Sequence, residues 1–255
     1  MEQKYTLKDK LKSMGPGILV VGSFIGPGTV TSATSAGAGY GYALLWTVVF
    51  SVIAVVVMQE MAARLGIVTQ NGLAEELVKD LSDRPALKWF MVVLVAAAIT
   101  LGGFAYMGGD LTGTAIGLSA ITGIPSNIIA PIWGCCVLVL INIGDAVKSL
   151  EKLLSICVTI MAVVFVVTMI VVKPDLGELL SGIVPTVPEG SMLTCVSLIG
   201  TTVVPYNMFI HATSARKTWH DPKELPLARF DTTVSMIIGG VITRSNLVSG
   251  GSRQG

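Results

Sequence analysis

The chain has 255 residues, of which 52% are hydrophobic and only 13% are charged, and its formal net charge is +1. Soluble domains carry about 25% charged residues, so this chain lacks the side chains needed to cover a water-exposed surface on all sides. The near-zero charge and the lack of basic clusters argue against nucleic-acid binding. Composition therefore predicts an all-α protein embedded in a lipid bilayer.

Seven apolar segments are candidates for membrane-spanning helices, which need about 20 residues each. In chain order they are Gly15–Ala38, Ala43–Met58, Trp89–Met107 with an extension to Ile124, Ile128–Ile143, Leu153–Val172, Met192–Ala215 and Thr232–Thr243. The intervening segments hold nearly all charges and most Pro and Gly clusters, as loops do. The last segment is expected to stay helical only to about Ile242, which is too short to cross the bilayer.

The distribution of Lys and Arg predicts the orientation of these spans. With a cytoplasmic N-terminus, fourteen of the 17 basic residues fall on the inner side of alternating loops. Lys173 alone falls outside, and Arg244 and Arg253 lie in the tail. Such an asymmetry is a strong positive-inside signal. We therefore expect a multi-pass protein of the plasma (inner) membrane, with residues 1–14 in the cytoplasm.

Cysteine usage and motifs exclude several other classes. The four cysteines lie inside apolar runs without C-x-x-C spacing, which indicates inert thiols rather than a disulfide or a zinc site. They are Cys135, Cys136, Cys157 and Cys195. The sequence contains no Walker, G-x-S-x-G or H-E-x-x-H motif, so we expect neither an enzyme nor a bound cofactor.

Two of the predicted spans carry helix-breaking residues near their centres. The first contains Gly26-Pro27-Gly28-Thr29 and the sixth contains Thr201-Thr202-Val203-Val204-Pro205-Tyr206. Proline removes a backbone hydrogen bond, so a kinked helix is one interpretation. The other is a pair of discontinuous helices, since spans one and six stand in the relation expected of two inverted five-helix repeats. Unwound backbone at membrane depth is tolerated where it lines a cavity, and paired breaks indicate a transporter's central site.

Several motifs in order resemble the Nramp (natural resistance-associated macrophage protein) family of divalent-metal transporters. They are the Gly-Pro-Gly triplet, Tyr42-Ala43-Leu44-Leu45-Trp46, Ala63-Arg64-Leu65-Gly66-Ile67, Gly113-Thr114-Ala115, Leu150-Glu151-Lys152 and Gly200-Thr201-Thr202-Val203-Val204-Pro205, ending at His211. The resemblance implies the LeuT-like inverted-repeat fold and proton-linked uptake (symport) of metal ions into the cytoplasm.

The resemblance also implies an incomplete fold. Residues 15–175 match the first repeat, with spans one to five, and residues 191–243 match span six and part of span seven. Residues 244–255 then read as a polar tail that is truncated or non-native. We expect that the full-length relative transports while this polypeptide alone does not.

The site positions depart from the family pattern. The family motif Asp-Pro-Gly-Asn is replaced by Gly26-Pro27-Gly28-Thr29, and Val204 stands where the family has Met. The metal-binding positions that the resemblance implies are Gly26, Thr29, the carbonyl of Thr201, and Val204; Pro27, Gly28, Thr202 and Pro205 complete the substrate site.

Hydroxyls and carbonyls in that site favour a hard ion that keeps its water, such as Mg²⁺. Because no carboxylate remains at these positions and half-helix N-termini attract anions, a small organic solute is the alternative substrate. A fragment without transport activity is the third interpretation.

Two further residues are candidates for a proton pathway. Asp110 falls at an acidic position of the family's third span, where Glu is common, and its companion acid is replaced by Met107. A charged Asp at the bilayer centre costs about 2.5–3.5 kcal/mol, so Asp110 faces the bundle interior or is protonated, unless it reaches water at a span end. His211 matches a family histidine and titrates near neutral pH, although a lone histidine is more often only hydrogen-bonded.

Two other patterns have a structural interpretation. Glu60 and Arg64 are spaced for an ion pair one helical turn apart. Gly109, Gly113 and Gly117 recur every four residues, which predicts a smooth helix face for close packing.

Overall fold

The structure is a computed structural model that describes residues 5–142 and 176–251, and between them residues 156, 159–161, 163–165, 167, 168 and 171. The predicted span Leu153–Val172 lies largely outside the described residues. The motif Leu150-Glu151-Lys152, Cys157 and the last residues, 252–255, lie outside them as well.

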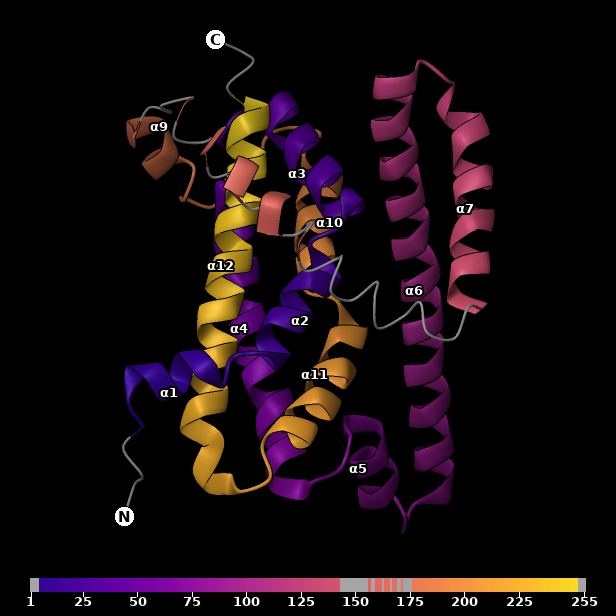
Figure 1. Ribbon diagram of the computed structural model, residues 1–255, viewed down its shortest axis with the longest axis vertical. Helices are drawn as coiled ribbons and strands as arrows, with labels where there is room; N and C mark the ends of the chain where they lie inside the picture. The colour runs from indigo at the N-terminus through magenta and orange to yellow at the C-terminus, as the bar shows by residue number, and fades with distance from the viewer. Residues whose placement is uncertain are drawn as a thin grey trace. The chain divides into compact units, whose positions relative to one another are not determined.

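All regular secondary structure in the described ranges is helical (Figure 1). The helices are α1 (Leu7–Lys12), α2 (Pro16–Phe24), α3 (Pro27–Tyr40), α4 (Leu45–Thr69), α5 (Leu73–Asp80), α6 (Pro85–Thr122), α7 (Ser126–Asn142), α9 (Leu176–Ser181), α10 (Met192–Thr202), α11 (Pro205–Thr218), the 3₁₀ turn η1 (Pro222–Glu224) and α12 (Leu225–Gly251).

Four of the described helical segments are long and apolar enough to cross a membrane. They are α4, α6, the α10–α11 segment Met192–Thr218, and Pro222–Gly251. The pair α2 and α3 makes a fifth if it counts as one span, and it is bent by 60° at its break. These helices confirm the predicted all-α membrane class.

The predicted end of the seventh span is wrong, because α12 continues through the expected polar tail to Gly251. The hydroxyls of Ser245 and Ser249 donate to the carbonyls of Val241 and Ser245, at 2.8 Å each, so these polar residues find partners inside the helix. Leu247 and Val248 are fully buried. The boundary at residues 243 and 244 is therefore a change of composition and not a helix end.

The second span is also longer than the sequence predicts, since α4 runs to Thr69 rather than ending near Met58. Glu60 and Arg64 form the expected ion pair at 2.5 Å, and Arg229 adds a second one to Glu60 at 2.8 Å. Charges that are paired in this way do not force the helix to end.

The chain divides into two compact units. The first comprises Met1–Phe24, Val49–Gly103 and Thr202–Gly240, and the second comprises Ile25–Val48, Phe104–Thr201 and Val241–Gly255.

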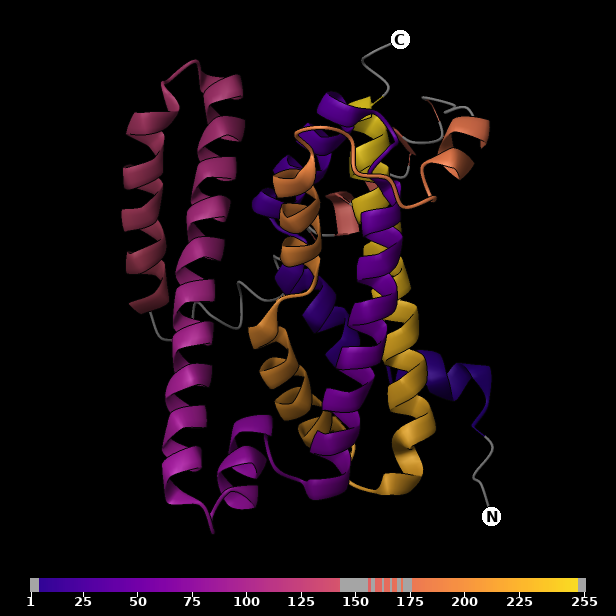
Figure 2. The same cartoon turned by 180° about the vertical axis from the view of Figure 1, so that it is seen from behind.

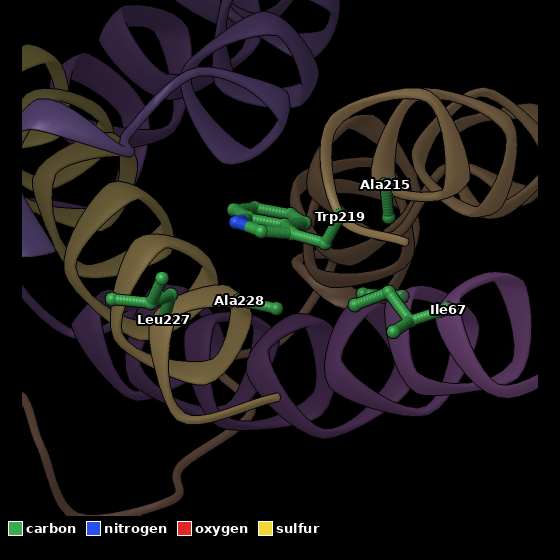
Figure 3. Packing of buried hydrophobic residues seen from close by; sticks show 6 residues of the cluster. Ile67, Ala215, Trp219, Leu227 and Ala228 are labelled. Carbon is green, nitrogen blue, oxygen red and sulfur yellow. The ribbon is translucent and has the colours of Figure 1, made fainter. Parts of the chain in front are cut away.

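In the first unit, α11 packs against α2 and α5, and α4 lies beside α12 in both views (Figures 1 and 2). A hydrophobic cluster joins these helices (Figure 3), with Ala63 and Ile67 from α4, Ala215 from α11, Trp219 just after it, and Leu227 and Ala228 from α12. Trp219 is 1% exposed and is the largest side chain of this core.

In the second unit, α3 packs very closely on the C-terminal part of α12. A Cβ atom at Gly37 would overlap the backbone of Leu247, and one at Gly250 would overlap the backbone of Thr34. The hydroxyls of Ser32 on α3 and Ser197 on α10 lie 3.5 Å apart, and α3 and α10 are neighbours in both views (Figures 1 and 2). These contacts fix the helix that begins at the first break.

Candidate functional site

The first break places the start of α3 inside the chain's first span. Gly26 is the N-cap with an extended backbone (φ −123°, ψ −179°), and Pro27 is the first helical residue. Gly26 has no side chain, so it cannot accept hydrogen bonds from the free N–H groups that every helix N-terminus presents. The helix start therefore depends on another part of the chain.

Asp110, on α6, supplies the missing acceptor. Its Oδ1 atom accepts a hydrogen bond from the backbone N–H of Gly28 at 3.2 Å. A Cβ atom at Gly26 would lie 2.7 Å from the same oxygen. The carboxylate of Asp110 thus lies where a side chain at position 26 would begin.

Tyr106, one turn before Asp110 on α6, connects the start of α3 to Thr201 of α10 within the second unit. Its hydroxyl donates to the carbonyl oxygen of Thr201 at 2.7 Å and lies 3.1 Å from the Thr29 hydroxyl. Thr29 is fully buried. The structure therefore brings Thr29 and Thr201 to one phenol hydroxyl that the sequence interpretation did not include. Its spacing of four residues from Asp110 could have indicated it, because such residues share a helix face.

A cavity of about 570 Å³ lies on the side of Gly26 and Pro27, the residues that start α3. Gly26, Pro27 and Gly113 form part of its wall, and the side of α3 that faces it includes Thr31 and Thr34. The predicted packing role is confirmed for Gly113, since a Cβ there would lie 2.7 Å from the Cβ of Pro27.

The other two glycines of this stripe, Gly109 and Gly117, have different surroundings. Gly109 lies against Gly28, with 3.8 Å between the position of a Cβ and the Gly28 Cα atom. At Gly117 a Cβ would meet nothing within 4 Å, and that residue lines the cavity. Part of the stripe thus packs helices and part leaves open space.

The second break lies between α10 and α11. Val204 is the N-cap of α11 (φ −94°, ψ 121°), Pro205 is its first residue, and no side chain of the cap residue satisfies the helix start. Thr202 and Val204 are buried and Pro205 is exposed. These three residues belong to the first unit, whereas Thr201 and residues 26–29 belong to the second.

Polar side chains of the first unit gather near the residues that flank the breaks. The hydroxyl of Ser23 lies 2.8 Å from Oδ1 of Asn207, and the Tyr206 hydroxyl lies 3.5 Å from the Ser23 carbonyl oxygen. Asn207 is fully buried, and its Nδ2 atom has no hydrogen-bond partner among the described residues. Neither Ser23 nor Asn207 was among the sequence-predicted site residues.

His211 lies in the same unit and is fully buried. Its Nδ1 atom is 3.0 Å from Oε1 of Gln59 on α4, and its Nε2 atom has no hydrogen-bond partner in the part of the chain that the structure describes. Within that part, His211 has one polar neighbour and one ring nitrogen without a partner. Gln59 was missed, although an amide in an apolar span is a signal for a polar contact.

A second aspartate caps the other half of the first span. The backbone N–H groups of Gly15 and Gly17 donate to the carboxylate of Asp231 at 3.3 and 2.7 Å, and the Ser235 hydroxyl adds a third bond at 3.3 Å. The start of α2, Gly15-Pro16-Gly17, repeats the Gly-Pro-Gly triplet that starts α3. This repeat could have revealed Asp231, which the sequence interpretation missed.

Among the described residues no group of three or more His, Cys, Asp or Glu side chains could hold a metal ion. The acceptor groups near the start of α3 are all oxygens: one carboxylate, two hydroxyls and one backbone carbonyl. Oxygen sets of this kind suit hard cations.

Comparison with known families gives this arrangement its context. The profile described as natural resistance-associated macrophage protein-like matches residues 17–251. The chain belongs to the Nramp family. The sequence-based resemblance to Nramp proteins is thereby confirmed.

Characterised Nramp relatives are considerably longer than this chain. It is 30% identical over 242 residues to the divalent metal cation transporter MntH of Klebsiella pneumoniae, covering 92% of this chain and 57% of that protein. It is 28% identical over 227 residues to the natural resistance-associated macrophage protein 2 homolog of Dictyostelium discoideum, covering 88% and 35%. The chain thus spans between a third and just over half of these relatives.

Solved Nramp structures share the fold. A crystal structure of the Eremococcus coleocola manganese transporter in complex with an aromatic bis-isothiourea substituted compound matches with a TM-score of 0.71 at 23% identity, covering 98% of this chain and 54% of that one. A single-residue mutant of the same transporter matches with a TM-score of 0.75. The predicted LeuT-like fold is confirmed, over about half of the solved Nramp chain.

Proposed function

We propose that this Nramp chain serves secondary-active transport of divalent metal ions into the cytoplasm, with hydrated Mg²⁺ as the favoured substrate. The observation that carries the proposal is the set of oxygen atoms at the start of α3, from Thr29, Tyr106, Asp110 and Thr201. Substrates of this type also agree with the names of the relatives, which are a divalent metal cation transporter and a manganese transporter.

The choice of Mg²⁺ rests on the ligands that are present. Mg²⁺ gives up its water reluctantly and is bound through a few oxygen groups, whereas thioether ligands favour softer transition metals. Val204 provides no sulfur, and Gly26 provides no ligand beyond its backbone. The cavity of about 570 Å³ beside Gly26 and Pro27 has room for an ion with its bound water.

Proton coupling is part of the proposal and involves Asp110 and His211. Asp110 is an acid within a long apolar helix, and one ring nitrogen of His211 has no partner among the residues that the structure describes. Groups of this type inside a membrane carry protons in many transporters. The basic residues of the inner loops support a cytoplasmic N-terminus in an inner membrane.

Cation binding to the purified 255-residue chain tests the proposal directly. Isothermal titration with MgCl₂ and with MnCl₂ should give a dissociation constant, Kd, for Mg²⁺ that is no larger than that for Mn²⁺. A preference for Mn²⁺ of about ten-fold, or 1.4 kcal/mol, would refute the ligand argument. Binding of carboxylates or amino acids, with no divalent cation bound, would support the organic-solute alternative.

A further inference from the structure

We infer that Asp110 provides the negative charge that offsets a bound divalent cation in this chain, in place of an acidic residue at position 26. This inference rests on the proposed function and names the residue that makes cation binding possible there. It assigns the charge to α6 instead of to the start of α3.

The first support is the position of the carboxylate. Oδ1 of Asp110 lies 2.7 Å from where a Cβ atom of residue 26 would be, and it is bound to the Gly28 N–H. A carboxyl side chain at position 26 and the carboxylate of Asp110 would therefore compete for one place. Glycine at position 26 leaves that place to Asp110.

The second support is that the charge of Asp110 is not offset by any described residue. Asp110 forms no ion pair within the described part of the chain, and its Oδ2 atom has no hydrogen bond there. A carboxylate within a membrane-spanning helix is costly unless it is paired, so a cation that pairs with it is stabilised.

The third support is the set of neutral oxygen atoms around the Tyr106 hydroxyl. Tyr106 lies one turn away on the same helix, and its hydroxyl lies beside the Thr29 hydroxyl and the Thr201 carbonyl oxygen. One carboxylate with several neutral oxygens is the kind of donor set in which Mg²⁺ keeps part of its water. The cavity lined by Gly26 and Pro27 adjoins the start of α3.

Asp231 is the matched control for the structural part of this arrangement. Like Asp110, it is an aspartate that accepts a hydrogen bond from the backbone N–H of the last glycine in a Gly-Pro-Gly helix start. Unlike Asp110, it has hydrogen-bond partners on both carboxylate oxygens, namely Gly17, Gly15 and Ser235. A loss of capping alone should therefore affect both positions, whereas a loss of cation binding should affect Asp110 only.

The experiment compares three variants of the 255-residue chain: D110A, the double variant G26D/D110A and the control D231A. Titration with MgCl₂ and thermal unfolding are measured on each. D110A should raise the Kd for Mg²⁺ by about ten-fold or more, because the charge that pairs with the ion is gone. G26D/D110A, which returns a carboxylate to the same place, should recover most of the affinity, while D231A should lower the unfolding temperature without changing Kd.

Three results would overturn the inference: an unchanged Kd in D110A, an equal loss in D231A, or no recovery in G26D/D110A. If D110A does not elute as a single folded species, D110N takes its place, since its amide can still accept from the Gly28 N–H. A wild-type chain that binds no divalent cation would refute the proposed function itself. A wild-type chain that binds, together with a D110A variant that binds equally well, would refute only the role of Asp110.

Discussion

Tyr106 combines two contacts in one hydroxyl, to the Thr201 carbonyl oxygen and to the Thr29 hydroxyl. Both partners lie at residues that flank a helix break, where backbone groups lack the usual helical partners. A hydroxyl in this position stabilises the start of α3 and the Thr201 carbonyl group within the second unit.

The Y106F variant removes this hydroxyl while keeping the ring. We expect the free energy of unfolding in detergent to fall by about 0.5–1.5 kcal/mol, the usual net value of a hydrogen bond. Y5F is the control, since the Tyr5 hydroxyl makes a long, exposed contact of 3.4 Å with the Lys223 carbonyl oxygen. Equal losses in the two variants would contradict a special role for Tyr106.

Glu75, on α5 outside the membrane-spanning segments, gives a pH dependence. The N–H of Gly72 and the guanidinium of Arg216, at 2.6 Å, hold the pKa of Glu75 below its ordinary value of 4.5. A lowered pKa in the folded state means that the stabilisation is present above the unfolded-state pKa and is lost as the pH falls through the folded one.

We therefore expect wild type to be more stable than E75Q at pH 7. The difference should shrink as the pH falls below 4.5, the ordinary value for Glu75. Chemical unfolding of both proteins across this range measures it. A difference that stays constant on acidification would show that the Glu75 carboxylate does not contribute through its charge.

At the scale of elements, the contact between α3 and α12 in the second unit depends on glycine. Gly37 has no room for a Cβ atom, because the Leu247 backbone occupies that space, whereas a Cβ at Gly39 on the same helix would meet nothing within 4 Å. Small residues of this kind let membrane helices approach closely.

The pair of variants G37A and G39A separates packing from helix propensity. G37A should lower stability by about 1–3 kcal/mol through overpacking. G39A should be neutral or stabilising by about 0.5–1 kcal/mol, because alanine is the better helix former. Thermal unfolding in detergent checks both, and similar effects of the two changes would contradict the packing shown by the structure.

The sequence predicted helices well where apolar runs are long and end at Gly or Pro. The third span, expected from Trp89 to about Ile124, is α6 from Pro85 to Thr122, and the fourth, expected from Ile128 to Ile143, is α7 from Ser126 to Asn142. Helix length was underestimated where polar residues enter the run.

The missed segments have partners that local sequence does not reveal. On α4, Gln59 meets His211 and Glu60 meets Arg229, which lie 152 and 169 residues away. The same reason explains why the sequence identified only some of the site residues. Gly26, Thr29 and Thr201 were found from motifs, whereas Tyr106 enters through a contact to Thr201 across 95 residues.

At the scale of the whole molecule, many large apolar side chains are exposed along the long helices. Within the most apolar window of α6 none of the residues is buried inside the structure. Trp89, Phe90 and Phe104 are 67%, 60% and 74% exposed. Such surfaces are compatible with lipid and not with water.

Cysteine labelling tests the predicted orientation in the membrane. In a background without the four native cysteines, S82C in the loop before α6 should react with a membrane-impermeant maleimide only in inverted vesicles. E189C, in the loop before α10, should react only in right-side-out vesicles, because the positive-inside asymmetry places it on the other face. The reverse pattern would overturn the topology.

The remote aspartate caps have a consequence for biosynthesis. Gly28 leaves the ribosome 82 residues before Asp110, and Gly17 leaves it 214 residues before Asp231. Both halves of the first span therefore enter the translocation machinery with amide groups that have no acceptor yet. The start of α2 is synthesised early, but it gains its hydrogen-bond acceptor only after translation has passed the start of α12.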